Sequence, residues 1–259
     1  MFAAPVTFTA GRWQGAPYVA GGASRPSAGV IDSFRLAGDL DGDGRAEAAA
    51  LLWSSSGGSG TLLYLAVYAN TAGGPQNLDT VLIGDRVQIR AARVDVGLVV
   101  LDVVQPGSGD AACCPGETAT RRWRLADGTL SELPVETTGR LAVVALEGVE
   151  WRLERPGNDP ALPRSTGMTL QVAGDRIGGN AGCNDYFGAV RDGASPGEIE
   201  ISVTGNAGKS CAQDVMSAEA LYLANLAAVT NFGFLNGELI MTTRRADAID
   251  TLVFRGDVR

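Results

Sequence analysis

The stretch "GDLDGDGRAE", residues 38–47, places carboxylates at alternating positions directly before an apolar run. Counted from Asp39, acidic side chains occupy positions 1, 3 and 5, a glycine occupies position 6, and a glutamate occupies position 9. Ca²⁺ prefers six to eight oxygen ligands at about 2.3 to 2.6 Å, and a tight turn with this pattern aims alternate side chains inward. The predicted calcium ligands are Asp39, Asp41, Asp43, the backbone carbonyl of Arg45, and Glu47.

This acidic loop differs from an EF-hand. Position 12 is Ala50 rather than a bidentate glutamate, and we expect a strand rather than a helix to follow. The loop resembles instead the nine-residue calcium loops of FG-GAP-type repeats and related extracellular β modules. The alternative is a solvated Asp/Gly turn without a metal. Because the sequence identifies no nucleophile beside the loop, we expect a structural ion that fixes the loop where the strand begins.

The chain contains no histidine among its 259 residues. This excludes Ser/His/Asp and Cys/His nucleophile systems and HExxH zinc sites, all of which need imidazole. Paired carboxylates of the glycosidase type remain, as does a Ser/Lys pair at Lys209 and Ser210. Neighbouring residues of a strand point to opposite faces, so Lys209 would not readily serve Ser210 as a base unless a turn intervenes. A non-catalytic binding or envelope-maintenance module is favoured, and a carboxylate-based hydrolase of an envelope or extracellular polymer is the alternative.

The charge balance narrows the class of partner. The chain has 29 acidic and 21 basic residues, for a net charge of −8, which disfavours nucleic acid. It has no apolar run long enough to span a membrane. The expected partner is an unidentified protein or a small ligand. If Trp13, Tyr18, Trp53 or Tyr186 line an open groove with carboxylates, a carbohydrate or a peptide would fit.

The length allows two domains, and a polar interval places their boundary near residue 140, giving domains 1–140 and 141–259. In the first domain, short apolar runs bounded by Gly, Asp, Asn and Pro predict an all-β sheet or sandwich. Residues 61–68, "TLLYLAVY", are apolar at both alternating sets of positions and predict a central strand covered on both faces. In the second domain, residues 214–232 carry apolar residues at helical spacing and predict one helix.

The second domain carries an ordered series of motifs: "LEGVEWRLE" (146–154), "TLQVAGDRIGGNAGCNDYFG" (169–188), Cys211, "EALYLANL" (219–226) and "LVFRG" (252–256). In this order they resemble the META domain family, of the HslJ-like type, over about residues 142–256. The resemblance implies a compact α+β domain with a curved or barrel-like sheet and one helix, exported in bacteria and without an established catalytic activity. The block before it resembles the β domain of bacterial lipoproteins.

The four cysteines lack CxxC spacing, so disulfides and an oxidising compartment are the natural interpretation. Cys183 and Cys211 both belong to the META motifs, and a bridge between them would constrain the unfolded chain by roughly 3.6 kcal/mol. Two buried thiols are the alternative. For Cys113 and Cys114, a vicinal bridge and two free thiols both remain open, because adjacent Cα atoms lie about 3.8 Å apart, below the usual disulfide range. Disulfides that join Cys113 or Cys114 to a cysteine of the second domain are the least favoured pairing.

These features together favour a bacterial protein that is periplasmic, anchored to the outer membrane, or secreted. The first residues, "MFAAPVTFTAG", have neither the charged start nor the apolar core of a signal peptide. We therefore expect the export signal to be absent from this sequence, and a lipid anchor upstream is compatible with it.

Overall fold

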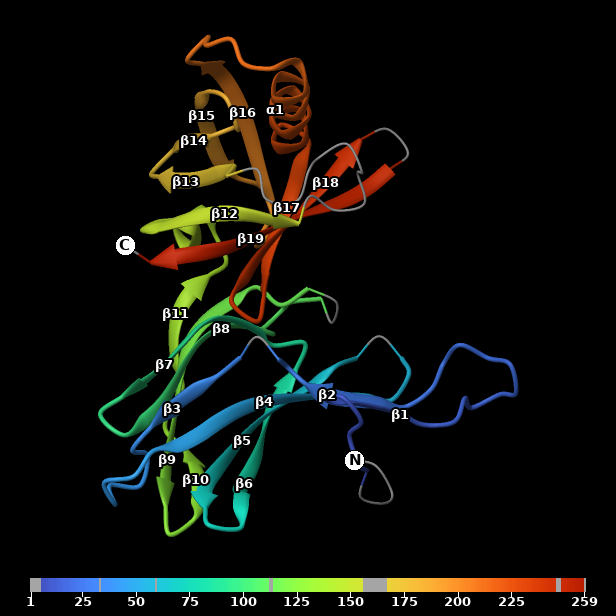
Figure 1. The fold of residues 1–259 in the computed structure, drawn as a ribbon, viewed down its shortest axis with the longest axis vertical. Coiled ribbons are helices and arrows are strands. Elements are labelled where there is room, and N and C mark those ends of the chain that lie inside the picture. Colours follow the sequence, from blue (N-terminus) through green and yellow to red (C-terminus); the bar gives the residue numbers. More distant parts are fainter. Residues whose placement is uncertain are drawn as a thin grey trace. The chain divides into compact units, whose positions relative to one another are not determined.

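The computed structural model describes residues 6–32, 34–58, 60–111, 114–155, 167–245 and 248–258. The chain divides into two compact units, Met1–Gly139 and Arg140–Arg259, and each is described by itself. Strands dominate both units, and the described residues contain one α-helix (Figure 1). The prediction of a mainly β protein with one helix is confirmed.

The first unit contains an antiparallel sheet with the strand order β1-β2-β4-β5-β6. The strand β5 pairs with one edge of β4, while β2 and β3 share the other edge of β4. The bounds of these strands are β1 Arg12–Gln14, β2 Ser27–Val30, β3 Leu36–Gly38, β4 Glu47–Ser55, β5 Leu62–Thr71 and β6 Gly74–Asp85.

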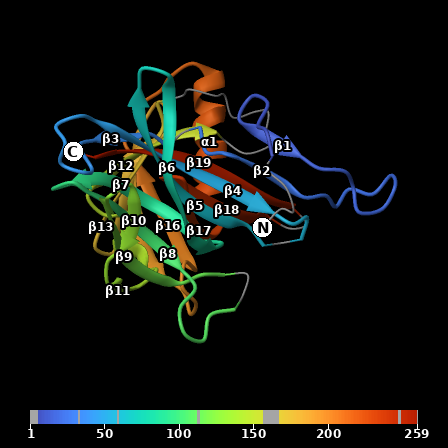
Figure 2. The ribbon, with the colours of Figure 1, turned by 90° about the horizontal axis from the view of Figure 1, so that it is seen from below.

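A second antiparallel sheet of the same unit has the order β10-β9-β8-β7, with β11 paired to β9. Figure 2 shows β4, β5 and β6 beside β8, β9 and β10. The bounds are β7 Gln88–Asp95, β8 Leu98–Gln105, β9 Glu117–Ala126, β10 Thr129–Glu132 and β11 Glu136–Arg140.

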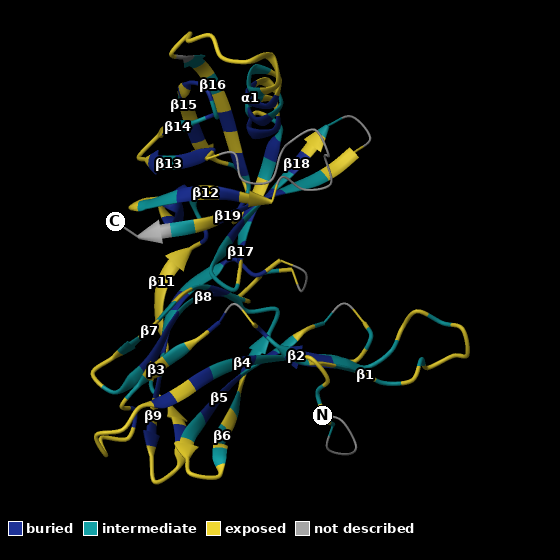
Figure 3. Ribbon diagram, in the orientation of Figure 1, coloured by how far each residue is buried: buried dark blue, intermediate teal, exposed yellow. Residues whose placement is uncertain are grey.

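One hydrophobic cluster joins the two sheets of the first unit. Leu51 on β4, Leu65 on β5, Leu101 on β8 and Trp123 on β9 are almost completely buried in it. Because successive side chains of a strand point to opposite faces, only one face of each strand enters this cluster. Buried and exposed positions accordingly alternate along strands such as β4 (Figure 3). The first unit is therefore a β-sandwich.

The outer face of β5 is less covered than the sequence predicts. Leu62, Tyr64 and Tyr68 on this face are only half-buried, and the small Ala66 between the two tyrosines is the exception. The prediction that both faces of β5 are covered is wrong for this face, because the second sheet packs against the opposite face alone.

The second unit is built on one eight-stranded antiparallel sheet with the order β16-β15-β14-β13-β12-β19-β18-β17. An isolated bridge between Glu198 and Asn231 brings the two ends of this sheet together, so the sheet curls toward a barrel as predicted. The bounds are β12 Val149–Arg155, β13 Thr169–Ala173, β14 Arg176–Asn180, β15 Asp185–Asp192, β16 Ile199–Asn206, β17 Val229–Leu235, β18 Glu238–Arg245 and β19 Ala248–Val258. A short 3₁₀ helix spans Val143–Leu146.

The helix α1, Gln213–Leu226, connects β16 to β17 and buries Ala218, Tyr222 and Leu226 at a spacing of four residues. It ends earlier than the sequence predicts, because Val229 begins β17. From there Phe232 and Phe234 are buried in a strand that pairs with β18. The β-branched and aromatic residues after Leu226 favour a strand, and pairing with β18 decides the outcome.

The β-sandwich predicts that shortening a side chain on the core face of β5 lowers the free energy of unfolding more than shortening one on the outer face. Leu65→Ala should lower the free energy of unfolding by about 2 to 5 kcal/mol, because it leaves a cavity in the core. Leu62→Ala removes the same atoms from the half-buried outer face and should cost clearly less. Urea unfolding of the full chain measures both losses, and equal losses would contradict the assignment of the core face.

Candidate functional site

The acidic loop connects β3 to β4 in the first unit. One carboxylate oxygen from each of Asp39, Asp41 and Asp43 lies within 4.8 Å of the other two, and all three side chains are exposed. Gly42 and Gly44 have φ angles of 82° and 85°, in the left-handed region that glycine adopts without strain. These two glycines allow the turn that brings the alternating aspartates together.

Backbone N–H groups of the loop hold the carboxylates in place. Gly42 N and Gly44 N donate to the two carboxylate oxygens of Asp39, at 2.7 and 3.1 Å. Asp43 N donates to Asp41 Oδ1 at 3.1 Å, and Arg45 N donates to Asp43 Oδ1 at 2.7 Å. The loop is thus already wound with its acidic side chains converging.

Glu47 has a different place from the three aspartates. It begins β4, is 4% exposed, and accepts a hydrogen bond at Oε2 from Leu40 N at 2.9 Å. Its other oxygen has no partner among the described residues. Glu47 does not join the converging oxygens, but it lines the same cavity of about 540 Å³ as Asp41 and Asp43, together with the β5–β6 turn.

The donor set fits a hard cation. Two oxygens bound to one Ca²⁺ at about 2.3 to 2.6 Å lie at most about 5 Å apart, and the three aspartates meet that limit. Oxygen-only ligands are also what Ca²⁺ and Mg²⁺ prefer. A buried carboxylate that lacks a partner for one oxygen is costly, and a nearby cation would reduce that cost.

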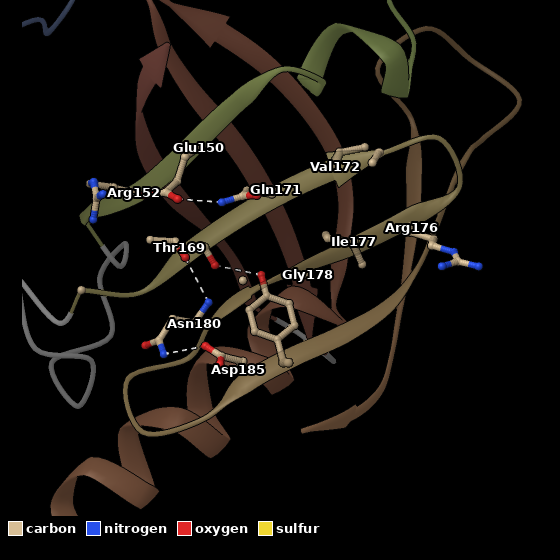
Figure 4. A pocket seen from close by; sticks show the side chains of 14 residues that line it. Glu150, Arg152, Thr169, Gln171, Val172, Arg176, Ile177, Gly178, Asn180 and Asp185 are labelled. Carbon is tan, nitrogen blue, oxygen red and sulfur yellow. Dashed lines mark hydrogen bonds and ion pairs between the residues drawn. The ribbon is translucent and has the colours of Figure 1, made fainter. Parts of the chain in front are cut away.

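A groove of about 660 Å³ lies on the second unit, across β12, β13, β14 and β15 (Figure 4). Gln171 Nε2 donates to Glu150 Oε2 at 2.6 Å, and Asn180 Nδ2 donates to Asp185 Oδ1 at 3.0 Å. The polar groups of the groove therefore largely bond to one another. Arg152 and Arg176 lie at opposite ends of the groove in Figure 4.

Two buried tyrosines support the wall of this groove. The hydroxyls of Tyr186 and Tyr222 both donate to the backbone carbonyl of Thr169, at 3.0 and 3.2 Å. Burial raises the pKa of both hydroxyls, and for Tyr222 the neighbouring Tyr186 raises the pKa further. Both tyrosines therefore stay neutral donors at physiological pH and hold β13 against β15 and α1.

The "RIGGNAGCN" turn is fixed by a buried polar network. Asn184 N donates to Glu219 Oε2 at 2.8 Å, and Asn184 Nδ2 donates to Glu219 Oε1 at 2.9 Å. Lys209 N donates to Asn184 Oδ1 at 2.6 Å, which attaches the loop before α1. At Gly179, an added Cβ would lie 2.1 Å from the carbonyl oxygen of Thr169, so no side chain fits there.

The disulfide between Cys183 and Cys211 is present, as the sequence predicts, and ties the same turn to the loop before α1. Cys113 lies outside the described residues, so the predicted vicinal bridge with Cys114 is not described. No cysteine in the described part of the chain is a free thiol, which makes the free-thiol alternative wrong for Cys114.

The four candidate aromatic residues have different surroundings. Tyr18 is 62% exposed and lines a groove on the first unit, whereas Tyr186 is buried. Trp13 is half-buried, and Trp53 packs against the core.

Sequence reasoning missed Glu219 as the partner of Asn184, because the two residues are distant in sequence and only the fold brings them together.

Residues 144–255 match the family model of the META domain. This match lies within the second unit and agrees with its single helix and curled sheet. Searches of curated proteins and of solved structures found no match to the chain. Among the described residues, no helix has the length and apolar character needed to cross a membrane.

The Glu219 network predicts a specific loss of stability. In Glu219→Gln, the amide nitrogen that replaces one carboxylate oxygen would face the donors of Asn184. The free energy of unfolding should fall by about 1 to 3 kcal/mol, the cost of unsatisfied buried polar groups. Glu200→Gln, which removes an exposed partner of Arg191, is the matched control and should cost less than about 1 kcal/mol. Similar losses in both variants would contradict the assigned role.

The tyrosine pair predicts a loss of stability at alkaline pH. Above about pH 10, the unfolded chain releases tyrosine protons that the folded chain retains. Below about pH 10, the two tyrosines therefore add no pH dependence to the free energy of unfolding. Above that pH, they make the free energy of unfolding fall as pH rises. Tyr222→Phe should make the fall between pH 9 and 11 shallower, because the variant lacks one of the two hydroxyls whose pKa burial raises. Urea unfolding at several pH values measures the slopes, and an unchanged slope in Tyr222→Phe would refute this prediction.

Proposed function

We propose that the protein is an exported, non-catalytic binding module in which a calcium-stabilised β-sandwich is joined to a META domain. The observation that carries the proposal is the convergence of Asp39, Asp41 and Asp43 within 4.8 Å. In this account, the three aspartates and the Arg45 carbonyl bind Ca²⁺. Glu47, whose second carboxylate oxygen has no partner in the described part of the chain, adds negative charge at the edge of the site.

The role of the ion would be structural. The loop leads directly into β4, and two residues after Glu47 the chain enters the core at Ala49, followed by Leu51. An ion that neutralises the aspartates removes their mutual repulsion and fixes the start of this strand. The affinity should lie in the weak extracellular range, on the order of 10⁻⁴ to 10⁻³ M, or somewhat tighter.

Several features support an extracytoplasmic setting. The disulfide between Cys183 and Cys211 fits an oxidising compartment such as the periplasm. An HslJ-like, lipoprotein-like protein anchored to the outer membrane, a periplasmic protein and a secreted protein would all meet this condition. Weak calcium sites are also useful where the ion is abundant, which is the case outside the cytoplasm.

The absence of histidine supports a binding role over a catalytic one. In the groove of the second unit, Glu150 and Asp185 each accept hydrogen bonds from neighbouring amides. Such satisfied carboxylates serve to position the wall of the groove, which would receive a small ligand or a segment of a partner protein.

A calcium-dependent melting experiment tests the proposal. At 10 mM Ca²⁺ and a Kd near 10⁻⁴ M, linkage predicts a gain of about 2.7 kcal/mol in the free energy of unfolding relative to EDTA. The melting temperature of the full chain should rise accordingly by several degrees. The triple variant Asp39→Asn, Asp41→Asn, Asp43→Asn should show no rise.

The matched control is Asp127→Asn. Asp127 is exposed, lies in a turn of the same unit and has a φ of 51°, which asparagine also tolerates. This variant should keep the full response to calcium. If wild type shows no rise over EDTA, or if the triple variant responds as wild type does, the calcium site is wrong.

A further inference from the structure

A groove of about 560 Å³ lies on the face of the first sheet that the second sheet does not cover. Its floor is formed by even-numbered residues of two neighbouring strands, Leu52 and Ser54 on β4 and Leu62 and Tyr64 on β5. The register pairs Ser54 with Leu62 and Leu52 with Tyr64, so the four side chains form two adjacent rows. The odd-numbered residues of the same strands point into the core.

The wall of this outer groove comes from the segments that flank β1. Val6, Phe8 and Tyr18 line it, and Tyr18 is 62% exposed. Trp53 also borders the groove, but it packs against the core cluster. The aromatic residues available to a ligand are therefore Phe8, Tyr18 and Tyr64, which combine large apolar rings with two phenolic hydroxyls.

Hydroxyl groups accompany these rings. Ser54 Oγ and Tyr64 OH lie 3.3 Å apart on the floor, and Ser56 and Thr80 also line the groove. A mostly apolar site with a few placed hydroxyls is typical of a small-molecule pocket. An entirely apolar ligand would leave these hydroxyls without water and without new partners, which is costly.

The only charged side chain that lines the outer groove among the described residues is Asp85. One of its carboxylate oxygens forms an ion pair with Arg86 Nη1 at 2.6 Å, and the other accepts a hydrogen bond from Thr61 N at 2.8 Å. The groove therefore carries no unbalanced charge. Such a site favours an uncharged ligand, because a charged one would lose hydration without gaining a counter-charge.

The backbone of the floor is not available to a peptide. β5 pairs with β4 along one edge and with β6 along the other, and β4 pairs with β5, β2 and β3. The backbone N–H and C=O groups of these central strands are thus used within the sheet. An extended peptide that adds a strand needs a free sheet edge, and the floor offers none.

We propose that the outer groove binds a neutral oligosaccharide. A pyranose ring has apolar C–H faces that pack on aromatic rings, and its edge carries hydroxyls that bond to Ser54, Tyr64 and the rim. This ligand class is uncharged, rich in hydroxyls and flat on its faces, which matches the three properties of the groove. The proposal names a ligand for the binding module proposed above and rests on that function, but it does not involve the calcium loop.

Isothermal titration of the full chain tests the proposal with four probes: cellohexaose, chitohexaose, xylohexaose and mannohexaose. At least one should bind with a Kd below about 1 mM. Tyr64→Ala and Tyr18→Ala should each weaken that binding by about tenfold or more, since aromatic anchors carry most of the energy of such contacts. Tyr18 lies on an exposed segment, so its variant reports on binding even if Tyr64→Ala destabilises the fold.

Tyr68→Ala is the matched control, because Tyr68 lies on the same face of β5 but outside the groove. It should bind the sugar as wild type does. Polygalacturonate, an anionic sugar polymer, is titrated as a fifth probe for comparison. The proposal is overturned if none of the four neutral sugars binds, including the case in which polygalacturonate alone binds. It is also overturned if Tyr68→Ala loses as much affinity as the groove variants. Repeating the titration in EDTA below the melting temperature separates the two proposals: sugar binding should persist even where calcium stabilisation fails.

Discussion

Three like charges lie within 4.8 Å of one another in the β3–β4 loop of the first unit, and their mutual repulsion must be offset where the chain folds. Each pair repels by roughly 1 kcal/mol even at the dielectric constant of bulk water. Backbone N–H groups of the loop offset part of this repulsion, but they donate from a neutral backbone and cannot cancel the charge. A cation among the aspartates would convert the repulsion into attraction at the point where the chain enters the sandwich.

In the second unit, the turn at residues 176–184 is stabilised in a different way. Its polar groups are buried and paired: Asn184 is enclosed by Glu219 and the Lys209 backbone, and a disulfide lies beside them. The tyrosine hydroxyls on the Thr169 carbonyl extend the same support to the groove wall. The two loops therefore differ: the acidic loop of the first unit gathers exposed like charges, whereas the turn of the second unit is held by the buried, paired side chains of Asn184 and Glu219.

Features formed by residues close together in the sequence can be predicted from it, whereas features formed by residues far apart in the sequence cannot. The convergence of the aspartates depends on their alternation, on Gly42 and Gly44, and on backbone N–H groups of the same loop, so the local spacing suffices to predict it. The position of Glu47 depends on burial at the start of β4, and the partly open face of β5 depends on where the second sheet packs. The grooves combine residues that are far apart in the chain, such as Tyr18 and Tyr64, and no local pattern places them together.

A crystal structure of the full chain grown with 10 mM CaCl₂ tests the central claim most directly. The account predicts one peak of anomalous difference density in the β3–β4 loop, about 2.3 to 2.6 Å from oxygens of Asp39, Asp41 and Asp43. Density that shows the three carboxylates turned apart, with only water between them at that calcium concentration, would contradict it.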